Sequence, residues 1–189
     1  MKKVLVSILF LATVLSLNHP AAGQTGSNSL NDQLIVAANS FDVAAVRLLL
    51  DKGANIDAKD INGYTALISA AVVGEFDIVK LLLEKGANIE ARDNDGYTAL
   101  YTAATSSLSK PEVVKLLLAK GANIEARDNH GRTPLIEAAL MGKAEIARLL
   151  LDKGANIEAK DNNGETALNN AESGEKSEVV KLLREHGAR

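Results

Sequence analysis

The sequence predicts an all-α fold: a solenoid of about five helix–turn–helix units with extended finger loops. Two motifs in one register predict it. The tetrapeptide Gly-Ala-Asn-Ile recurs at spacings of 33, 35 and 33 residues and begins at Gly53, Gly86, Gly121 and Gly154. The motif Asp-x-x-Gly-x-Thr keeps the same rhythm and begins at Asp60, Asp93, Asp128 and Asp161. One such unit cannot bury its own apolar surface, but a stack of units can.

Composition supports packed helices and excludes several kinds of chemistry. The 189 residues include three Tyr, three Phe and no Trp, so the core must consist mainly of Ala, Leu, Ile and Val. The absence of Cys excludes disulfides, thiolate metal sites and cysteine nucleophiles. The formal net charge of −3 argues against a dominant role in nucleic-acid binding, which usually shows as a strongly basic surface.

The first 23 residues have the pattern of a signal peptide. Lys2 and Lys3 precede an apolar run of 14 residues from Val4 to Leu17, shorter than the roughly 20 residues that span a bilayer. Ala21 and Gly23 fit the small-residue positions before a cleavage site, which places cleavage before Gln24; cleavage after Ala22 fits nearly as well. An uncleaved anchor and a buried helix are the alternatives. We expect residues 24–30 to form a flexible mature N-terminus, and the protein to be periplasmic or secreted.

The elements of one unit follow from its residues in order. Asp-x-x-Gly is turn chemistry, because the Asp side chain caps the turn and Gly accepts a positive φ. Thr65 is then a helix N-cap, and apolar residues at i, i+3 and i+4 from Leu67 predict a short helix with one apolar stripe. The run from Ile78 to Leu83 is too apolar for a single face, so this second helix must be covered on more than one side. Gly86 ends it as a left-handed C-cap.

These motifs resemble the ankyrin repeat family. The resemblance is carried by DxxGxTALxxAA from Asp60 to Ala71, by IVKLLL from Ile78 to Leu83, and by GANIEA from Gly86 to Ala91. It implies a non-catalytic scaffold that binds a protein partner through its finger loops and concave helix face. It covers a repeat domain of residues 31–189, with units at approximately 31–58, 59–91, 92–126, 127–159 and 160–189.

Several units depart from the family pattern. The first unit lacks the Asp-x-x-Gly turn, as expected of an end cap, and the third has two extra residues within Thr105–Pro111. The last unit carries Glu172 in place of the second Ala and is polar, which predicts a solvent-facing C-terminal cap. The position at which the family often has His holds other residues: Ile68, Tyr101, Ile136 and Asn169.

The sequence offers no catalytic, cofactor or metal site. His130 and His186 lie 56 residues apart in a solenoid, which makes a His-based zinc or acid–base site improbable. The stretch from Asp93 to Gly96 is similar to part of a calcium loop, but it lacks the alternating ligands and the distant Glu. No phosphate-binding Gly-rich loop or nucleophile elbow is present.

The resemblance implies a set of candidate partner-binding positions on the finger tips and first helices. Tyrosine is enriched in interface hot spots, and an apolar surface patch often marks a partner site. The alternative is that Tyr101, Val72 and Val73 are partly buried packing residues and that the finger tyrosines cover a neighbouring loop. The candidates are Ile61, Tyr64, Val72, Val73, Asp95, Tyr97, Tyr101, His130, Arg132, Leu140 and Met141.

A basic column also runs along the fingers, formed by Lys59, Arg92, Arg127 and Lys160. It predicts either local pairing with nearby acids or attraction to an acidic partner.

The sequence therefore predicts an exported protein-interaction scaffold, a monomer by itself, with no nucleic-acid partner and no stable membrane insertion after cleavage of the signal. A toxin-neutralising immunity or inhibitor protein, an accessory factor for a periplasmic enzyme and a secreted effector all remain open within this hypothesis. A small-ligand-binding protein or an enzyme that uses the finger groove is the alternative from another class.

Overall fold

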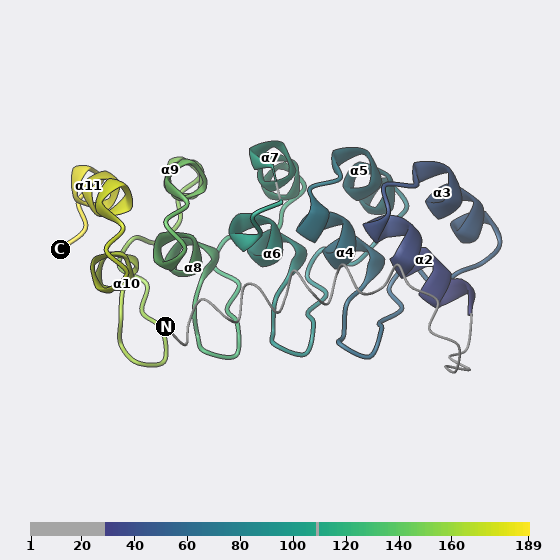
Figure 1. Cartoon of the computed structure of the whole chain (residues 1–189), viewed down its shortest axis with the longest axis horizontal. Coiled ribbons are helices and arrows are strands. Elements are labelled where there is room, and N and C mark those ends of the chain that lie inside the picture. Colours follow the sequence, from purple (N-terminus) through teal and green to yellow (C-terminus); the bar gives the residue numbers. More distant parts are fainter. Residues whose placement is uncertain (1–28, 109) are drawn as a thin grey trace.

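The computed structural model describes residues 29–108 and 110–189, and within them it contains ten α-helices and no β-strand. The helices form five antiparallel pairs that stand side by side in one row, which confirms the predicted solenoid (Figure 1). The predicted signal peptide lies outside the described residues. The helices are α2 (Leu30–Asn39), α3 (Val43–Asp51), α4 (Ala66–Val73), α5 (Phe76–Glu84), α6 (Ala99–Thr105), α7 (Pro111–Ala119), α8 (Pro134–Leu140), α9 (Ala144–Asp152), α10 (Ala167–Ser173) and α11 (Ser177–Glu185).

The row has three levels, and neighbouring units touch at each of them. The second helices of the pairs lie along one side, the first helices lie in the middle, and the finger loops project from the opposite side (Figure 1). Each first helix contacts the first helix of the next unit, and each second helix does the same. The first helix of the array begins at Leu30, one residue ahead of the expected start of the repeat domain.

Threonine caps start four of the five first helices, as the sequence predicts. The Oγ1 atom of Thr65 accepts a hydrogen bond at 3.3 Å from the N–H group of Ile68, and Thr98 does the same for Tyr101 at 3.2 Å. Thr133 and Thr166 repeat this bond in the last two units. Because each cap satisfies a backbone donor that no helical carbonyl can reach, it fixes where the first helix leaves its finger.

Small side chains allow the first helices to pack closely. All eight residues of α4 are buried, and they include three alanines. Ala70 and Ala71 are fully buried, as are the second-helix residues Ile78 and Leu82. A helix that is apolar on all sides is stable in water only when it is covered on all sides, and here the neighbouring units provide the cover.

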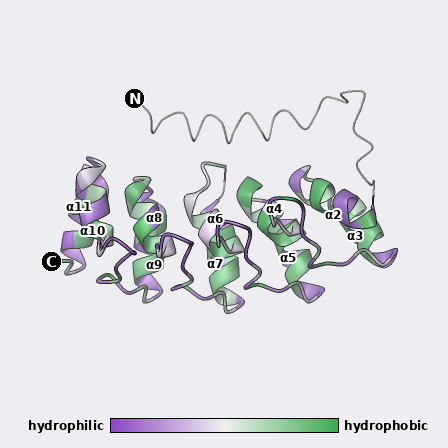
Figure 2. Ribbon diagram, turned by 90° about the horizontal axis from the view of Figure 1, so that it is seen from below, coloured by the Kyte–Doolittle hydropathy of each residue, from purple (hydrophilic) through white to green (hydrophobic). Residues whose placement is uncertain are grey.

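The last unit is polar, as predicted for a C-terminal cap. Figure 2 shows α10 and α11 as mainly hydrophilic or neutral, whereas the preceding helices carry broad hydrophobic faces. Arg184 occupies the position of the leucines Leu83 and Leu151 in earlier units, and its guanidinium group pairs with Glu172 at 2.7 Å. This end of the row therefore presents charge rather than apolar surface to the solvent.

Glu175 has a strained backbone, which leads to a prediction about stability. Its φ of 56° lies in the left-handed region, and the equivalent position in the fourth unit is Gly142, with a φ of 74°. A residue with a Cβ atom is disfavoured there by about 1 kcal/mol, although Gly also gains entropy in the unfolded chain. Glu175→Gly should raise the free energy of unfolding by roughly 0.5–1 kcal/mol in urea titrations. Gly142→Ala is the reciprocal variant and should lower the free energy of unfolding. An unchanged urea midpoint in both variants would show that the backbone of Glu175 is not strained.

Candidate protein-interaction surface

Each finger loop is held by its own aspartate. The Oδ1 atom of Asp60 accepts hydrogen bonds at 2.8 Å from the backbone N–H groups of Asn62 and Tyr64. The same pair of bonds recurs in the next three fingers, from Asp93, Asp128 and Asp161. One side chain thus closes the turn and points the residue at the tip outward.

Successive fingers are joined by a ladder of asparagine and backbone bonds. The backbone N–H of Asn94 donates to the carbonyl of Asn62 at 3.1 Å, and its side-chain Nδ2 donates to the carbonyl of Ile61 at 3.0 Å. Asn129 and Asn162 repeat both bonds toward the finger before them. Ile61 holds the equivalent position in the first finger, where no earlier finger offers a carbonyl, and its side chain is 93% exposed.

The basic column forms a second ladder. Lys59 Nζ donates to the carbonyl of Arg92 at 2.6 Å, the guanidinium group of Arg92 donates to the carbonyl of Arg127, and Arg127 Nη1 donates to the carbonyl of Lys160 at 2.6 Å. The bases therefore bind backbone carbonyls of the following unit, which neither of the two sequence hypotheses anticipated. Lys160, at the end of the column, is exposed.

Acidic side chains form a third ladder, beside the Gly-Ala-Asn-Ile segments. Asp57 Oδ1 accepts from the N–H of Asn88 at 2.8 Å, and Glu90 Oε1 accepts from the N–H of Asn123 at 2.7 Å. Glu125 and Glu158 continue the series toward Asn156 and Arg189. The recurring acids and bases of the repeat thus bind the neighbouring unit.

Because two fingers approach closely at Gly63 but not at Gly164, we expect alanine to destabilise the protein more at the first of these equivalent positions. Gly63 and Gly164 have nearly the same φ, 82° and 80°. A Cβ atom on Gly63 would lie 2.7 Å from Asn94 Oδ1 and 2.8 Å from Asn94 N, whereas one on Gly164 would meet nothing within 4 Å. We expect Gly164→Ala to lower the free energy of unfolding by about 1 kcal/mol through backbone strain alone, and Gly63→Ala by roughly 2–3 kcal/mol. Equal losses in urea titrations would show that the fingers do not touch as described.

The structure brings several predicted candidates to the finger tips and the concave side. Asp95 and His130 are exposed at successive tips, and Ile61 is exposed next to the tip residue of the first finger. Tyr64, Tyr97 and Arg132, two residues after the tips, are half-buried, as is Leu140, and Met141 is 45% exposed. Six of these eight residues belong to the finger loops, whereas Leu140 and Met141 lie at the opposite end of α8.

Three predicted candidates are buried, so their assignment to the open surface is wrong. Val72 and Val73 are each 6% exposed. They end α4 next to the longer turn of the third unit, whose Ser106 Oγ donates to the carbonyl of Val72 at 2.7 Å. Tyr101 is 2% exposed, because it lies within α6 and packs between two units. The packing alternative holds for these three residues.

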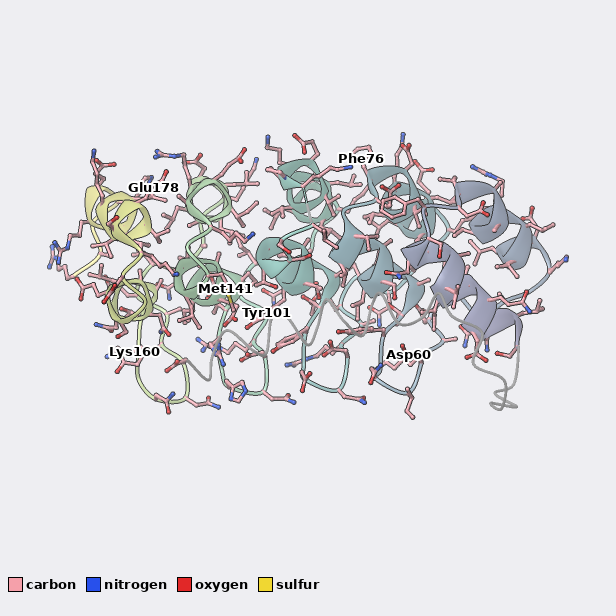
Figure 3. The ribbon with its side chains drawn as sticks, in the orientation of Figure 1. Asp60, Phe76, Tyr101, Met141, Lys160 and Glu178 are labelled. Atoms are coloured by element: carbon pink, nitrogen blue, oxygen red, sulfur yellow. The ribbon has the colours of Figure 1, made fainter. Side chains whose placement is uncertain are left out.

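Tyr101 belongs to a buried polar cluster between the third and fourth units. Its hydroxyl group donates to Asp128 Oδ2 at 3.0 Å, and its ring stacks on that of Tyr97, with centroids 4.6 Å apart and planes 5° apart. Arg132 lies 3.7 Å from Asp128 Oδ2 through Nε and contacts Glu137 through Nη1. Figure 3 places Tyr101 between the row of first helices and the fingers. We call Tyr101, Asp128, Arg132 and Glu137 the interunit cluster.

Burial dominates the electrostatics of the interunit cluster. It raises the pKa of Tyr101 far above its ordinary value and raises the pKa of Tyr97 to about 12, with Glu137 and Asp128 adding to both shifts. Burial also raises the pKa of Glu137, against the opposing effect of the Arg132 guanidinium group. Both tyrosine hydroxyl groups therefore stay protonated at neutral pH and can act as donors.

Sequence reasoning did not find the partners of Tyr101. Two signals pointed to them: a tyrosine at the family's His position, and Glu137 at a helix position that holds the small polar residues Ser69 and Thr102 in the two preceding units. A charged residue at a buried column position needs a partner, and Arg132 is the nearest varying base.

Among residues 29–108 and 110–189, no group of three or more His, Asp or Glu side chains could hold a metal ion. Within the same ranges, no helix has the length and apolar character needed to cross a membrane.

The row of stacked helix pairs, joined by finger ladders, defines a helical-repeat scaffold. A family model described as ankyrin repeats (3 copies) matches residues 34–128 and 107–189, so the chain belongs to the ankyrin repeat family. A search of curated proteins found no match. Ankyrin repeats generally mediate protein–protein interaction and are typically non-catalytic.

Proposed function

We propose that this protein is an exported, non-catalytic scaffold that binds a protein partner along its finger tips and concave side. One observation carries the proposal: three ladders use the recurring polar side chains to bind neighbouring units, while the tip position holds three different residue types in four fingers. Asn62, Asp95, His130 and Asn163 hold that tip position and are all exposed.

The ladders give the surface a physical advantage in binding. Each finger is closed by its own aspartate and bonded to the next finger, so little backbone freedom remains to be lost when a partner binds. Tyr64 and Tyr97 lie two residues after the tips and are half-buried, so less side-chain freedom remains to be lost when a partner binds. A surface that is already rigid converts more of its contact energy into affinity.

Export rests on the leader pattern of Lys2, Lys3 and the apolar run that follows them. N-terminal sequencing of the exported protein should begin near Gln24. Recovery of soluble cytoplasmic protein that still carries Met1 would contradict export. Within this setting the scaffold would serve as a toxin-neutralising or inhibitory protein, as an accessory factor for a periplasmic enzyme, or as a secreted effector.

A pull-down from the exported fraction tests the contact surface. The variant Asp95→Ala/His130→Ala changes two exposed tips and leaves every ladder bond in place, because those residues take part through their backbone only. It should recover at least about tenfold less partner, as expected when central contacts are truncated. Lys115→Ala/Arg148→Ala, on the exposed side of α7 and α9, is the matched control and should recover the wild-type amount. Recovery of the wild-type amount of partner by both variants would place the contact surface elsewhere.

A further inference from the structure

The outer face of the first unit carries apolar side chains that no other described residue covers. Val36 in α2 is 58% exposed, whereas Ser69 and Thr102 at the equivalent position are 5% and 6% exposed. Leu48 in α3 is 53% exposed, and its equivalent Leu81 is 5% exposed. Since the first unit differs from the next ones by having no described unit before it, this is the face on which a preceding unit would stack. We call Val36, Ala45 and Leu48 the N-terminal end face.

The two ends of the row are chemically unlike. At the C-terminal end Arg184 and Glu172 form an ion pair, and Lys181 and Glu185 are exposed around it. Repeat arrays need end units with polar outer faces to stay soluble. The C-terminal end meets this requirement and the N-terminal end face does not, so a cover is expected at the N-terminal end only.

A groove on this face shows what kind of cover fits. Its volume is about 360 Å³, and it runs between α2 and α3 over an apolar floor that includes Val36 and Leu49. Asp32 and Asp42 are among its lining residues, and none of the lining residues in the described part of the chain is a base. Both carboxylates also cap helices: Asp42 Oδ1, for example, accepts from the N–H of Ala45 at 2.9 Å. An apolar floor with acidic flanks suits an apolar segment that carries Lys or Arg beside its apolar side chains.

Phe41 adds an independent observation at the edge of this groove, between its lining residues Ser40 and Asp42. Its side chain is 59% exposed, and its φ of 63° lies in the left-handed region. The equivalent residue of the second unit is Gly74, with a φ of 73°. An exposed aromatic side chain thus occupies a position where glycine would be less strained, and aromatic residues are enriched at protein interfaces.

We propose that the N-terminal end face binds an amphipathic helix of a protein partner, with an apolar side on Val36 and Leu48 and with Lys or Arg beside Asp32 and Asp42. The inference rests on the proposed export, because removal of the leader leaves only the polar residues 24–28 ahead of Ser29. A helix laid across α2 and α3 would take the place of a preceding unit.

A second copy of the chain fits this face less well. Two copies joined face to face would bring Asp32 and Asp42 of both chains together, which like charges oppose. A head-to-tail arrangement would press Val36 and Leu48 against the charged groups Arg184 and Glu172. An external basic helix avoids both conflicts.

Titration with designed peptides tests the proposal. The probe is an 18-residue helical peptide with leucines on one face and lysines on the other, and the control peptide has glutamates in place of the lysines. The exported chain is purified and titrated with each peptide. In methyl NMR spectra, the lysine peptide should change the chemical shifts of the methyl groups of Val36 and Leu48. The glutamate peptide should bind at least tenfold more weakly. Equal affinity for the two peptides, or shifts confined to the finger residues, would overturn the proposal.

Variants locate the site. Val36→Asp and Leu48→Asp change exposed side chains and should each weaken binding of the lysine peptide by at least tenfold. Ile61→Asp, at an exposed finger tip, is the matched control and should leave that affinity unchanged. Equal weakening by all three would indicate a general charge effect and would contradict the proposed site.

The strained positions separate binding from stability. Phe41→Gly should raise the thermal midpoint by about 2–4 °C while weakening peptide binding at least fivefold. Glu175→Gly, at the equivalent strained position of the last unit, should raise the midpoint with no change in affinity. Unchanged affinity in Phe41→Gly would remove Phe41 from the site and contradict the proposal.

The remaining outcomes concern other occupants and the proposed function. A mass that doubles with concentration, and falls when the peptide is added, would assign the face to a second copy. The peptide could also bind only the chain that has lost the leader, while the methyl signals of Val36 and Leu48 in the chain that keeps the leader are shifted without any peptide. That result would assign the N-terminal end face to the leader. Either result overturns the partner proposal. Asp95→Ala/His130→Ala should leave peptide binding intact, so a failure at the N-terminal end face is distinct from a failure at the finger tips.

Discussion

Replacing Asp128 with alanine should lower the free energy of unfolding by about 3–4 kcal/mol, the largest effect expected of a single polar substitution here. Its Oδ1 atom holds the third finger through bonds at 2.9 Å and 2.7 Å to the N–H groups of His130 and Arg132. Its Oδ2 atom accepts from the Tyr101 hydroxyl group and faces Arg132. Alanine removes the turn, leaves a buried hydroxyl group without its acceptor, and takes one of two carboxylates away from a partly buried guanidinium group.

Asp161→Ala is the matched control for this prediction. Asp161 makes the same turn bonds, at 2.8 Å and 3.0 Å, but it belongs to the last finger and lies outside the interunit cluster. We expect a loss of roughly 1–2 kcal/mol, the usual effect of removing a side chain that caps backbone donors. The difference between the two variants in urea titrations measures what the interunit cluster adds. Equal losses would show that the cluster contributes nothing beyond the turn.

The fold could be predicted because its determinants are local and repeated. A period of 33 residues, the threonine caps and the glycine stops each act within one unit, and stacking follows from apolar faces that one unit cannot cover. The two residues inserted in the third unit lengthen one turn without changing the register of the helices that follow. The same locality explains why the polar last unit could be assigned as a cap from Glu172 and its neighbours.

The ladders could not be predicted because they depend on distances between units. Asn94 and Arg92 have ordinary surface side chains in the sequence, and only the stacked fingers bring carbonyl groups of neighbouring units within their reach. Val72 and Val73 were assigned to the surface for the same reason. Whether the end of a first helix is open depends on the neighbouring turn, and Ser106 of the longer third-unit turn bonds directly to Val72.

The N-terminal end face had a sequence signal that was interpreted only in part. The first unit lacks the Asp-x-x-Gly turn, which indicated an end cap, but the residues of its outer face are apolar, unlike those of the last unit. Val36 and Leu48 alternate with buried residues along their helices, so they are consistent with either a core or an open face. The exposed fractions, compared position by position with later units, separate the two cases.

Replacing Arg132 with methionine should lower the free energy of unfolding by about 2–3 kcal/mol at neutral pH. The side chain of Glu137 is 9% exposed, and Arg132 is the base that contacts it. Burial already raises the pKa of Glu137, and the guanidinium group is what opposes that rise. Without Arg132 the carboxylate must either remain charged in the core or take up a proton, so the variant raises its pKa further.

The pH dependence of this variant follows from the sign of that shift. A carboxyl group whose pKa is higher in the folded than in the unfolded protein stabilises the fold at low pH, and the contribution is lost as pH rises through the folded pKa. Arg132→Met should therefore lose stability as pH rises above the ordinary carboxyl range, more steeply than the wild type does. In Arg132→Met/Glu137→Gln the titrating group is gone, so the difference between the double and single variants should grow with pH in urea titrations. A difference that stays flat from acidic to neutral pH would mean that Glu137 does not titrate in the interunit cluster, and that the loss in Arg132→Met comes from packing alone.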